Sequence, residues 1–190
     1  VNDWPVGGDL FTSGTYEISS VRRGYALELV VDFVRQNIAR RGGWRMDPNE
    51  PMVSYPNQTL EEVVEGWPAG DVDARIGDWM NRPHQRWSIT AVPEAGGYLG
   101  GQYYKICIEG TDRALAATEG AELKVAEGFT GAPEQLWRIE QLIDGSYRIM
   151  PKAVPGCDCQ YVLTSIADST PTLAKWDFNS DNCKWNFRQL

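Results

Sequence analysis

The chain has 190 residues and a formal net charge of −8 at pH 7, from 26 acidic and 18 basic residues. This length fits one domain, or one domain that carries an insertion. The acidic balance argues against nucleic acid as a partner, because phosphate binding needs clustered cations. No membrane insertion is expected either, since a spanning helix needs about 20 mostly apolar residues and the sequence has no such run.

Two strands are expected near the start, at residues 14–18 and 25–29. The first alternates apolar and polar residues, which is the period of a half-buried strand. Residues 30–74 then break this pattern with apolar residues at helical spacing. Thr59 and Glu62 form a capping-box pattern, which marks the start of a helix. We therefore expect a partly helical insertion at about 30–74.

Short strands separated by Gly, Pro and Asn turns fill the rest of the chain. They are predicted at residues 76–79, 85–92, 103–109, 114–118, 123–126, 136–141, 147–151, 161–165, 172–176 and 184–188. The whole chain, residues 1–190, is expected to form a single domain. Its three units are expected at about 14–92, 101–142 and 145–190.

A short motif closes each unit, and another opens it. The closing motif has a Trp two residues before an apolar residue, and a Gln two residues before the Trp in the first two units. Its copies are Gln85 to Ile89, Gln135 to Ile139, and Cys183 to Phe187, where Cys takes the Gln place. The opening motif is Tyr-x-Ile, at Tyr16, Tyr104 and Tyr147. This repetition indicates three copies of one four-stranded unit.

Three phased Gln-x-Trp copies with matching Tyr-x-Ile partners resemble the ricin B-chain type β-trefoil, also called carbohydrate-binding module family 13. The resemblance covers most of the chain outside the insertion. It implies an all-β fold, a β-trefoil of three four-stranded units with a partly helical insertion in the first unit. It also implies that the first and last strands are neighbours. Regular short strands also suit a β-sandwich, which is the alternative fold.

The resemblance further implies a shallow sugar site in each unit. In the family, an Asp follows the Leu of the second strand, an aromatic ring ends the third strand, and an Asn precedes the motif Gln. Carboxylate and amide groups can pair with sugar hydroxyls, while the ring face takes the apolar C–H side of the sugar. Such sites are weak alone and gain strength by repetition.

The first unit keeps part of this set. Glu28 stands where the family has Asp, so the carboxylate remains but reaches one methylene further. Trp79 is the expected aromatic platform. His84 stands in the Asn place and precedes Gln85. These four residues are the candidate sugar contacts of the first unit.

The third unit keeps a different part. Thr164 replaces the acid, whereas Trp176 and Asn182 match the family pattern. Asp177 is a candidate carboxylate from the neighbouring loop, and Asp181 is the alternative. No site is expected in the second unit, where the three positions hold Ala116, Ala126 near the platform place, and Glu134. No unit keeps the full set, so any sugar site in this chain departs from the family pattern.

The four cysteines suggest disulfides and a secreted or extracellular protein. The preferred pair joins Cys183 to Cys157 or Cys159, because all three lie in the third unit. Cys107 lies between two isoleucines on a predicted strand and is expected to be a small buried residue. No metal site or other cofactor is expected, because the Cys and His spacing does not match a zinc motif.

The sequence leaves two classes of function. The first is a lectin-like protein that binds glycans or glycoproteins through the first and third units. The alternative is a protein-binding β-trefoil, such as a protease inhibitor, that uses its loops or the 30–74 insertion. No catalytic motif is present, so the protein is not expected to be an enzyme. The oligomeric state is open, with a homodimer as one option.

Overall fold

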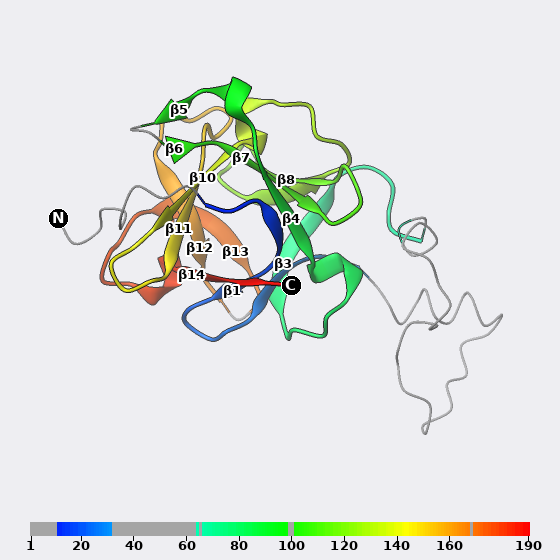
Figure 1. Ribbon diagram of the computed structural model, residues 1–190, viewed down its shortest axis with the longest axis horizontal. Helices are drawn as coiled ribbons and strands as arrows, with labels where there is room; N and C mark the ends of the chain where they lie inside the picture. The colour runs from blue at the N-terminus through cyan, green and yellow to red at the C-terminus, as the bar shows by residue number, and fades with distance from the viewer. Residues whose placement is uncertain (1–10, 32–63, 65, 99–100, 168) are drawn as a thin grey trace.

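The computed structural model describes residues 11–31, 64, 66–98, 101–167 and 169–190 (Figure 1). Over these residues the chain is built from short strands joined by turns and single 3₁₀ turns. The predicted all-β class is confirmed. Most of the predicted helical insertion lies outside the described residues. Strand β3 begins at Val72, so the connection from β2 to β3 ends at residue 71, earlier than predicted.

Each unit contributes four strands in chain order, as predicted. The first unit holds β1 (Gly14–Ser20), β2 (Ala26–Leu29), β3 (Val72–Gly77) and β4 (Trp87–Ala91). The second holds β7 (Tyr104–Ile108), β8 (Ala114–Ala117), β9 (Leu123–Ala126) and β10 (Trp137–Gln141). The third holds β11 (Tyr147–Pro151), β12 (Tyr161–Ser165), β13 (Pro171–Lys175) and β14 (Trp185–Gln189). A small hairpin of β5 (Gly97–Tyr98) and β6 (Gly101–Gln102) links the first two units.

Four 3₁₀ turns complete the regular structure. They are η1 (Pro83–Gln85), η2 (Pro93–Ala95), η3 (Pro133–Gln135) and η4 (Asp181–Cys183). Three of them, η1, η3 and η4, end on the residue two positions before a motif Trp. The same local turn therefore leads into the fourth strand of every unit.

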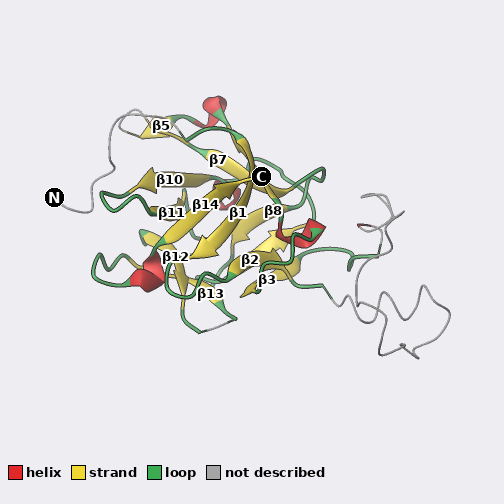
Figure 2. Ribbon diagram, turned by 60° about the horizontal axis from the view of Figure 1, so that its bottom comes forward, coloured by secondary structure: helices red, strands yellow, loops and turns green. Residues whose placement is uncertain are grey.

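The first and fourth strands of the three units close into a barrel. Antiparallel pairings run from β1 to β4, β7, β10, β11, β14 and back to β1. Closure leaves these strands without an open edge. Figure 2 shows β14 beside β1, where Tyr16 pairs with Gln189 and Ser20 with Trp185. The second and third strands of each unit pair with each other as hairpins, β2–β3, β8–β9 and β12–β13.

The motif tryptophans fill the barrel and make the same hydrogen bond in every unit. Trp87, Trp137 and Trp185 are fully buried. Each indole N–H donates to the carbonyl oxygen of the leucine on the second strand of its own unit. The pairs are Trp87 to Leu27 at 2.8 Å, Trp137 to Leu115 at 2.9 Å and Trp185 to Leu163 at 2.8 Å. All three tryptophans are therefore core residues, and each one links the second strand of its unit to the barrel.

The opening tyrosines of the three units surround Phe11. Rings of Tyr16, Tyr104 and Tyr147 lie 4.9–5.8 Å from the Phe11 ring, centroid to centroid. The Tyr104 hydroxyl donates to the Phe11 carbonyl oxygen at 3.0 Å. The segment before β1 therefore packs against equivalent positions of all three units. These aromatic contacts, edge-on for Tyr104 and Tyr147 and tilted for Tyr16, stabilise its placement.

The returning end of the insertion docks on the second unit. Trp67 is buried, and the Arg113 guanidinium lies 5.7 Å from its ring. Arg113 also donates to the Pro68 carbonyl oxygen at 2.8 Å, and Lys124 pairs with Asp71 at 2.7 Å. These contacts favour a structural role for Trp67, holding this end of the insertion in place.

The predicted disulfide partner of Cys183 is wrong. The structure joins Cys157 to Cys159, within the turn that precedes β12. Cys183 and Cys107 are free and buried. Burial raises the pKa of the Cys107 thiol to about 11, so it is protonated at neutral pH and unreactive. All three cysteines lie in the third unit, but Cys183 is the last residue of η4, where its side chain is buried and free.

Candidate functional site

The site is built from the loop that joins the third and fourth strands of each unit. In the first unit, residues 78–82 leave β3, and the η1 turn returns the chain to β4. Gln85, at the end of η1, is fully buried and braces this loop from below. Its side-chain oxygen accepts from the backbone N–H of Met80 at 2.8 Å, and its amide N–H₂ donates to the Asp78 carbonyl oxygen at 2.6 Å. The motif glutamine therefore fixes the loop that carries Trp79.

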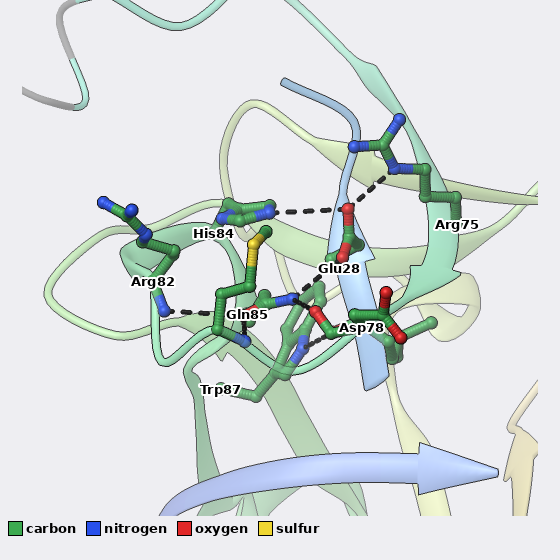
Figure 3. A network of polar contacts seen from close by, with 9 residues as sticks. Glu28, Arg75, Asp78, Arg82, His84, Gln85 and Trp87 are labelled. Carbon is green, nitrogen blue, oxygen red and sulfur yellow. Dashed lines mark hydrogen bonds and ion pairs between the residues drawn. The ribbon is translucent and has the colours of Figure 1, made fainter. Parts of the chain in front are cut away.

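Gln85 also belongs to a buried ionic network centred on Glu28 (Figure 3). Arg75, His84 and Gln85 converge on the Glu28 carboxylate, at 2.7, 3.4 and 2.9 Å. Glu28 is 2% exposed and His84 is fully buried. Gly77 makes room for the carboxylate, because a Cβ there would lie 2.8 Å from Glu28 Oε1.

The ionisation of Glu28 reflects these contacts. Burial alone raises the pKa of its carboxyl group. Hydrogen bonds from His84, Arg75 and Gln85 outweigh burial, so the pKa lies below its ordinary value. Glu28 is therefore a carboxylate at neutral pH, and its oxygens are already occupied by side chains of the protein.

We expect stability to fall at acid pH through Glu28. Because the folded-state pKa is lowered, its contribution is present above the unfolded value of 4.5 and is lost as the pH falls through the folded value. Urea unfolding from pH 6 down to pH 3 should therefore show a shallower decline for Glu28→Gln than for the natural protein. The control Glu94→Gln changes an exposed carboxylate of η2 and should leave the decline unchanged. Superimposed curves for Glu28→Gln and the natural protein would contradict this role.

The second and third units show how the brace varies. Gln135 makes the equivalent hydrogen bonds in the second unit. Its side-chain oxygen accepts from the Thr130 backbone N–H at 2.7 Å, and its amide N–H₂ donates to the Gly128 carbonyl oxygen at 3.0 Å. Cys183 takes this place in the third unit and makes only long contacts, 3.7 Å to the Thr164 hydroxyl and 4.0 Å to the Lys175 carbonyl oxygen. The third-unit loop is therefore held less tightly from below than the other two.

Each of these loops also carries an aromatic ring, and each ring has a cation of the barrel over it. The pairs, with the distance from the cation to the ring centroid, are Arg188 over Trp79 (5.2 Å), Lys105 over Phe129 (5.2 Å) and Arg148 over Trp176 (5.1 Å). A cation over a ring face is attracted by the ring quadrupole. All three units therefore place a ring and a cation together on the outside of the barrel.

The second-unit ring was missed from the sequence. The residue expected near the platform place, Ala126, is the last residue of β9 and buried. Phe129 occupies the equivalent loop position instead, because β3 and β9 end before the aromatic residue rather than on it. Trp79 and Phe129 each precede the motif glutamine by six residues, and this spacing is the signal that could have found Phe129.

The third-unit loop is the most open of the three. Phe178 is 53% exposed, and Asp177 and Asn179 beside it are also exposed. The Asp177 carboxylate accepts from the Asn179 backbone N–H at 3.0 Å, which shapes the turn. Asn182 and Trp176 are half-buried at the edge of this loop. Aromatic faces, carboxylates and amides thus meet on one surface; the sequence analysis had not singled out Phe178.

The structure therefore divides the predicted contact residues into two groups. Four of them are buried beneath the loops, namely Glu28, His84, Gln85 and Thr164. The other four reach the surface at least in part, namely Trp79, Trp176, Asp177 and Asn182. The buried group can position the loops, whereas the second group is accessible to a ligand. Among the described residues, no group of His, Cys, Asp and Glu could hold a metal ion.

Many solved structures match the fold of this chain, and three of them illustrate the range. A mosquitocidal holotoxin matches 95% of this chain with 15% identity and a TM-score of 0.61. A Polyporus squamosus lectin, bound to Neu5Aca2-6Galb1-4GlcNAc, matches 96% with 16% identity and a TM-score of 0.60. The BEL β-trefoil matches 99% with 13% identity and a TM-score of 0.56. The fold is a β-trefoil.

The share of each neighbour that this chain covers differs. This chain spans 18% of the holotoxin, 51% of the lectin and 99% of BEL. No family model matches the sequence, and no curated protein sequence matches it. At these identities the comparison establishes the fold, so the ricin-type resemblance stays a prediction. In the described part of the trefoil, no helical stretch has the length and hydrophobicity of a bilayer span.

Proposed function

We propose that this β-trefoil binds glycans through shallow sites on its first and third units. The observation that carries the proposal is the pair of half-buried tryptophans, Trp79 and Trp176, at equivalent loops of two units. Each ring is partly accessible and lies beside exposed polar side chains. Sugars need this combination, because a ring face takes their C–H side while polar groups pair with their hydroxyls.

The third unit supplies the fuller set of contacts. Trp176 and the exposed Phe178 offer apolar faces, while Asp177 and Asn182 offer acceptors and donors for hydroxyl groups. The loop between them is braced only by the long contacts of Cys183. It can therefore adjust to a ligand at a lower cost than the loop that Gln85 holds in the first unit.

The buried residues of the first unit act indirectly in this proposal. Glu28, His84 and Gln85 hold the loop that carries Trp79, and Thr164 lies under the corresponding loop of the third unit. Trp79 would then be the main direct contact of the first unit. Two weak sites on one chain would bind a branched or repeating glycan more tightly than either alone.

The structural neighbours support the proposal in general terms. The Polyporus squamosus lectin is described with a bound glycan, and its β-trefoil superposes on nearly the whole of this chain. Fold alone does not carry function, so the argument rests on the loops. A secreted or extracellular location is part of the same proposal, and the disulfide between Cys157 and Cys159 supports it.

A glycan array followed by fluorescence titration of the hits tests this function. Trp79→Ala and Trp176→Ala should each weaken binding, and the double variant should abolish it. Phe129→Ala removes the equivalent ring of the second unit and is the matched control, which should bind like the natural protein. Absence of binding across mono- and oligosaccharides would overturn the proposal. The protein-binding alternative, with loops or the insertion as the surface, would then be tested by screening proteases.

A further inference from the structure

The first-unit and third-unit rings differ in the cation that lies over them. The Arg188 side chain, over Trp79, is 58% exposed, whereas the Arg148 side chain, over Trp176, is 14% exposed. Arg148 pairs with Glu140, which is equally buried. The third-unit guanidinium is thus enclosed, while the first-unit guanidinium reaches solvent.

The position of Arg188 is fixed although it is exposed. It lies on β14 directly opposite Glu17 of β1. Its Nε–H and one terminal nitrogen both reach Glu17 Oε1 at 2.6 Å. A buried carboxylate on one side and the Trp79 ring beneath therefore set the orientation of the guanidinium plane.

This arrangement leaves donors of Arg188 available. A guanidinium has five N–H groups, and Glu17 takes two of them. The remaining donors have no hydrogen-bond partner among the described residues. An exposed, oriented guanidinium edge binds a carboxylate or sulfate oxygen pair with two parallel hydrogen bonds.

We propose that the first-unit site takes an acidic sugar, one that carries a carboxylate or a sulfate, and that Arg188 binds the acidic group while Trp79 stacks on the sugar ring. This inference rests on the proposed function and adds the ligand class of one of its two sites. Asp78 is the exposed acid next to Trp79 in the chain. The acidic group therefore approaches from the β14 side of the ring, where Arg188 lies.

The third unit provides an internal contrast. Lys184 is shared between Asp144 at 3.6 Å and Asp181 at 3.7 Å, and Asp177 adds another exposed carboxylate. Among the described residues here, three exposed acids (Asp144, Asp177 and Asp181) face one exposed lysine, Lys175, so this surface repels an acidic sugar. The two sites are thus matched in their rings but opposed in charge. Binding of an acidic sugar should therefore depend on Trp79 and not on Trp176.

The test uses six simple sugars with the full chain. They are glucose and galactose, each as the neutral sugar, the uronic acid and the 6-sulfate. Fluorescence titration should show the acidic forms binding roughly tenfold tighter than their neutral parents. Trp79→Ala should remove that preference, and Trp176→Ala should keep it. The uronic acids and the sulfates separate the two acidic groups that share this chemistry.

Variants of the guanidinium complete the test. Arg188→Gln would leave Glu17 without its cation, so Glu17→Gln/Arg188→Gln removes both charges together and should abolish the preference. Arg188→Lys keeps the charge but loses the planar fork, so it should retain only part of the preference. Arg22→Gln, an exposed arginine in the β1–β2 turn, makes the same charge change as Arg188→Gln and should have no effect.

The outcomes separate this inference from the proposed function. Equal binding of neutral and acidic sugars, or a preference that survives loss of Arg188, overturns the inference and leaves glycan binding standing. Binding of acidic sugars that depends on Trp176 rather than Trp79 also overturns it. No response to any of the six sugars overturns the inference, and the array of mono- and oligosaccharides then decides the proposed function.

Discussion

Replacing Trp137 with alanine should lower the free energy of unfolding by about 3–5 kcal/mol, the cost of removing a large aromatic side chain from a closed core. Trp137 is fully buried, and its indole N–H satisfies the Leu115 carbonyl oxygen at 2.9 Å. The substitution leaves a cavity at the centre of the barrel and an unpaired buried carbonyl. It also releases the β8–β9 hairpin from the barrel.

Urea unfolding followed by circular dichroism measures this change, and Trp137→Phe separates its two parts. The phenylalanine keeps most of the apolar volume but cannot donate to Leu115, so it should cost about 1–3 kcal/mol. Equal losses for the two variants would mean that the hydrogen bond, rather than packing, dominates. A loss below about 1 kcal/mol for the alanine variant would contradict the assignment of Trp137 to a closed core.

The second large effect is expected for Gln85→Leu, which should lower the free energy of unfolding by about 2–4 kcal/mol. Leucine has nearly the same size but cannot make the hydrogen bonds of Gln85 to Glu28, Met80 and Asp78. The Glu28 carboxylate would lose one donor while remaining buried. The loop that carries Trp79 would lose its brace, so first-unit binding should weaken as well.

Gln135→Leu is the matched comparison in the second unit. It removes the equivalent hydrogen bonds, to Thr130 and Gly128, but no buried carboxylate of the described residues contacts Gln135. It should lower the free energy of unfolding by a smaller amount, about 1–2 kcal/mol. The difference between the two variants in urea unfolding measures what the Glu28 contact adds. If Gln135→Leu cost as much as Gln85→Leu, the carboxylate would contribute nothing measurable.

The trefoil could be predicted because its signal repeats. Alternating burial fixes which face of each strand is inside, and three phased Trp positions fix how many units share the core. The structure agrees with this pattern, because each motif Trp donates a hydrogen bond to the leucine on the second strand of its own unit. The neighbouring first and last strands, β1 and β14, follow from the same repeat.

The chemistry of the site was less predictable. The sequence shows a glutamate, Glu28, after the leucine of the second strand, but it does not show that this side chain turns inward to meet Arg75 and His84. The Arg75 contact depends on the register of β2 against β3 across a long insertion. The cations over Trp79 and Trp176 come from strands that pair only when the barrel closes, so local pattern alone could not reveal them.

The central claim is that two of the eight tryptophans contact the glycan while the motif tryptophans only hold the fold. The most direct measurement is a titration of the indole N–H signals in a ¹⁵N spectrum with the strongest array hit. The account predicts that the signals of Trp79 and Trp176 shift with added glycan, while those of Trp87, Trp137 and Trp185 stay in place. Shifts confined to the buried tryptophans, or to indoles outside the first-unit and third-unit loops, would contradict it.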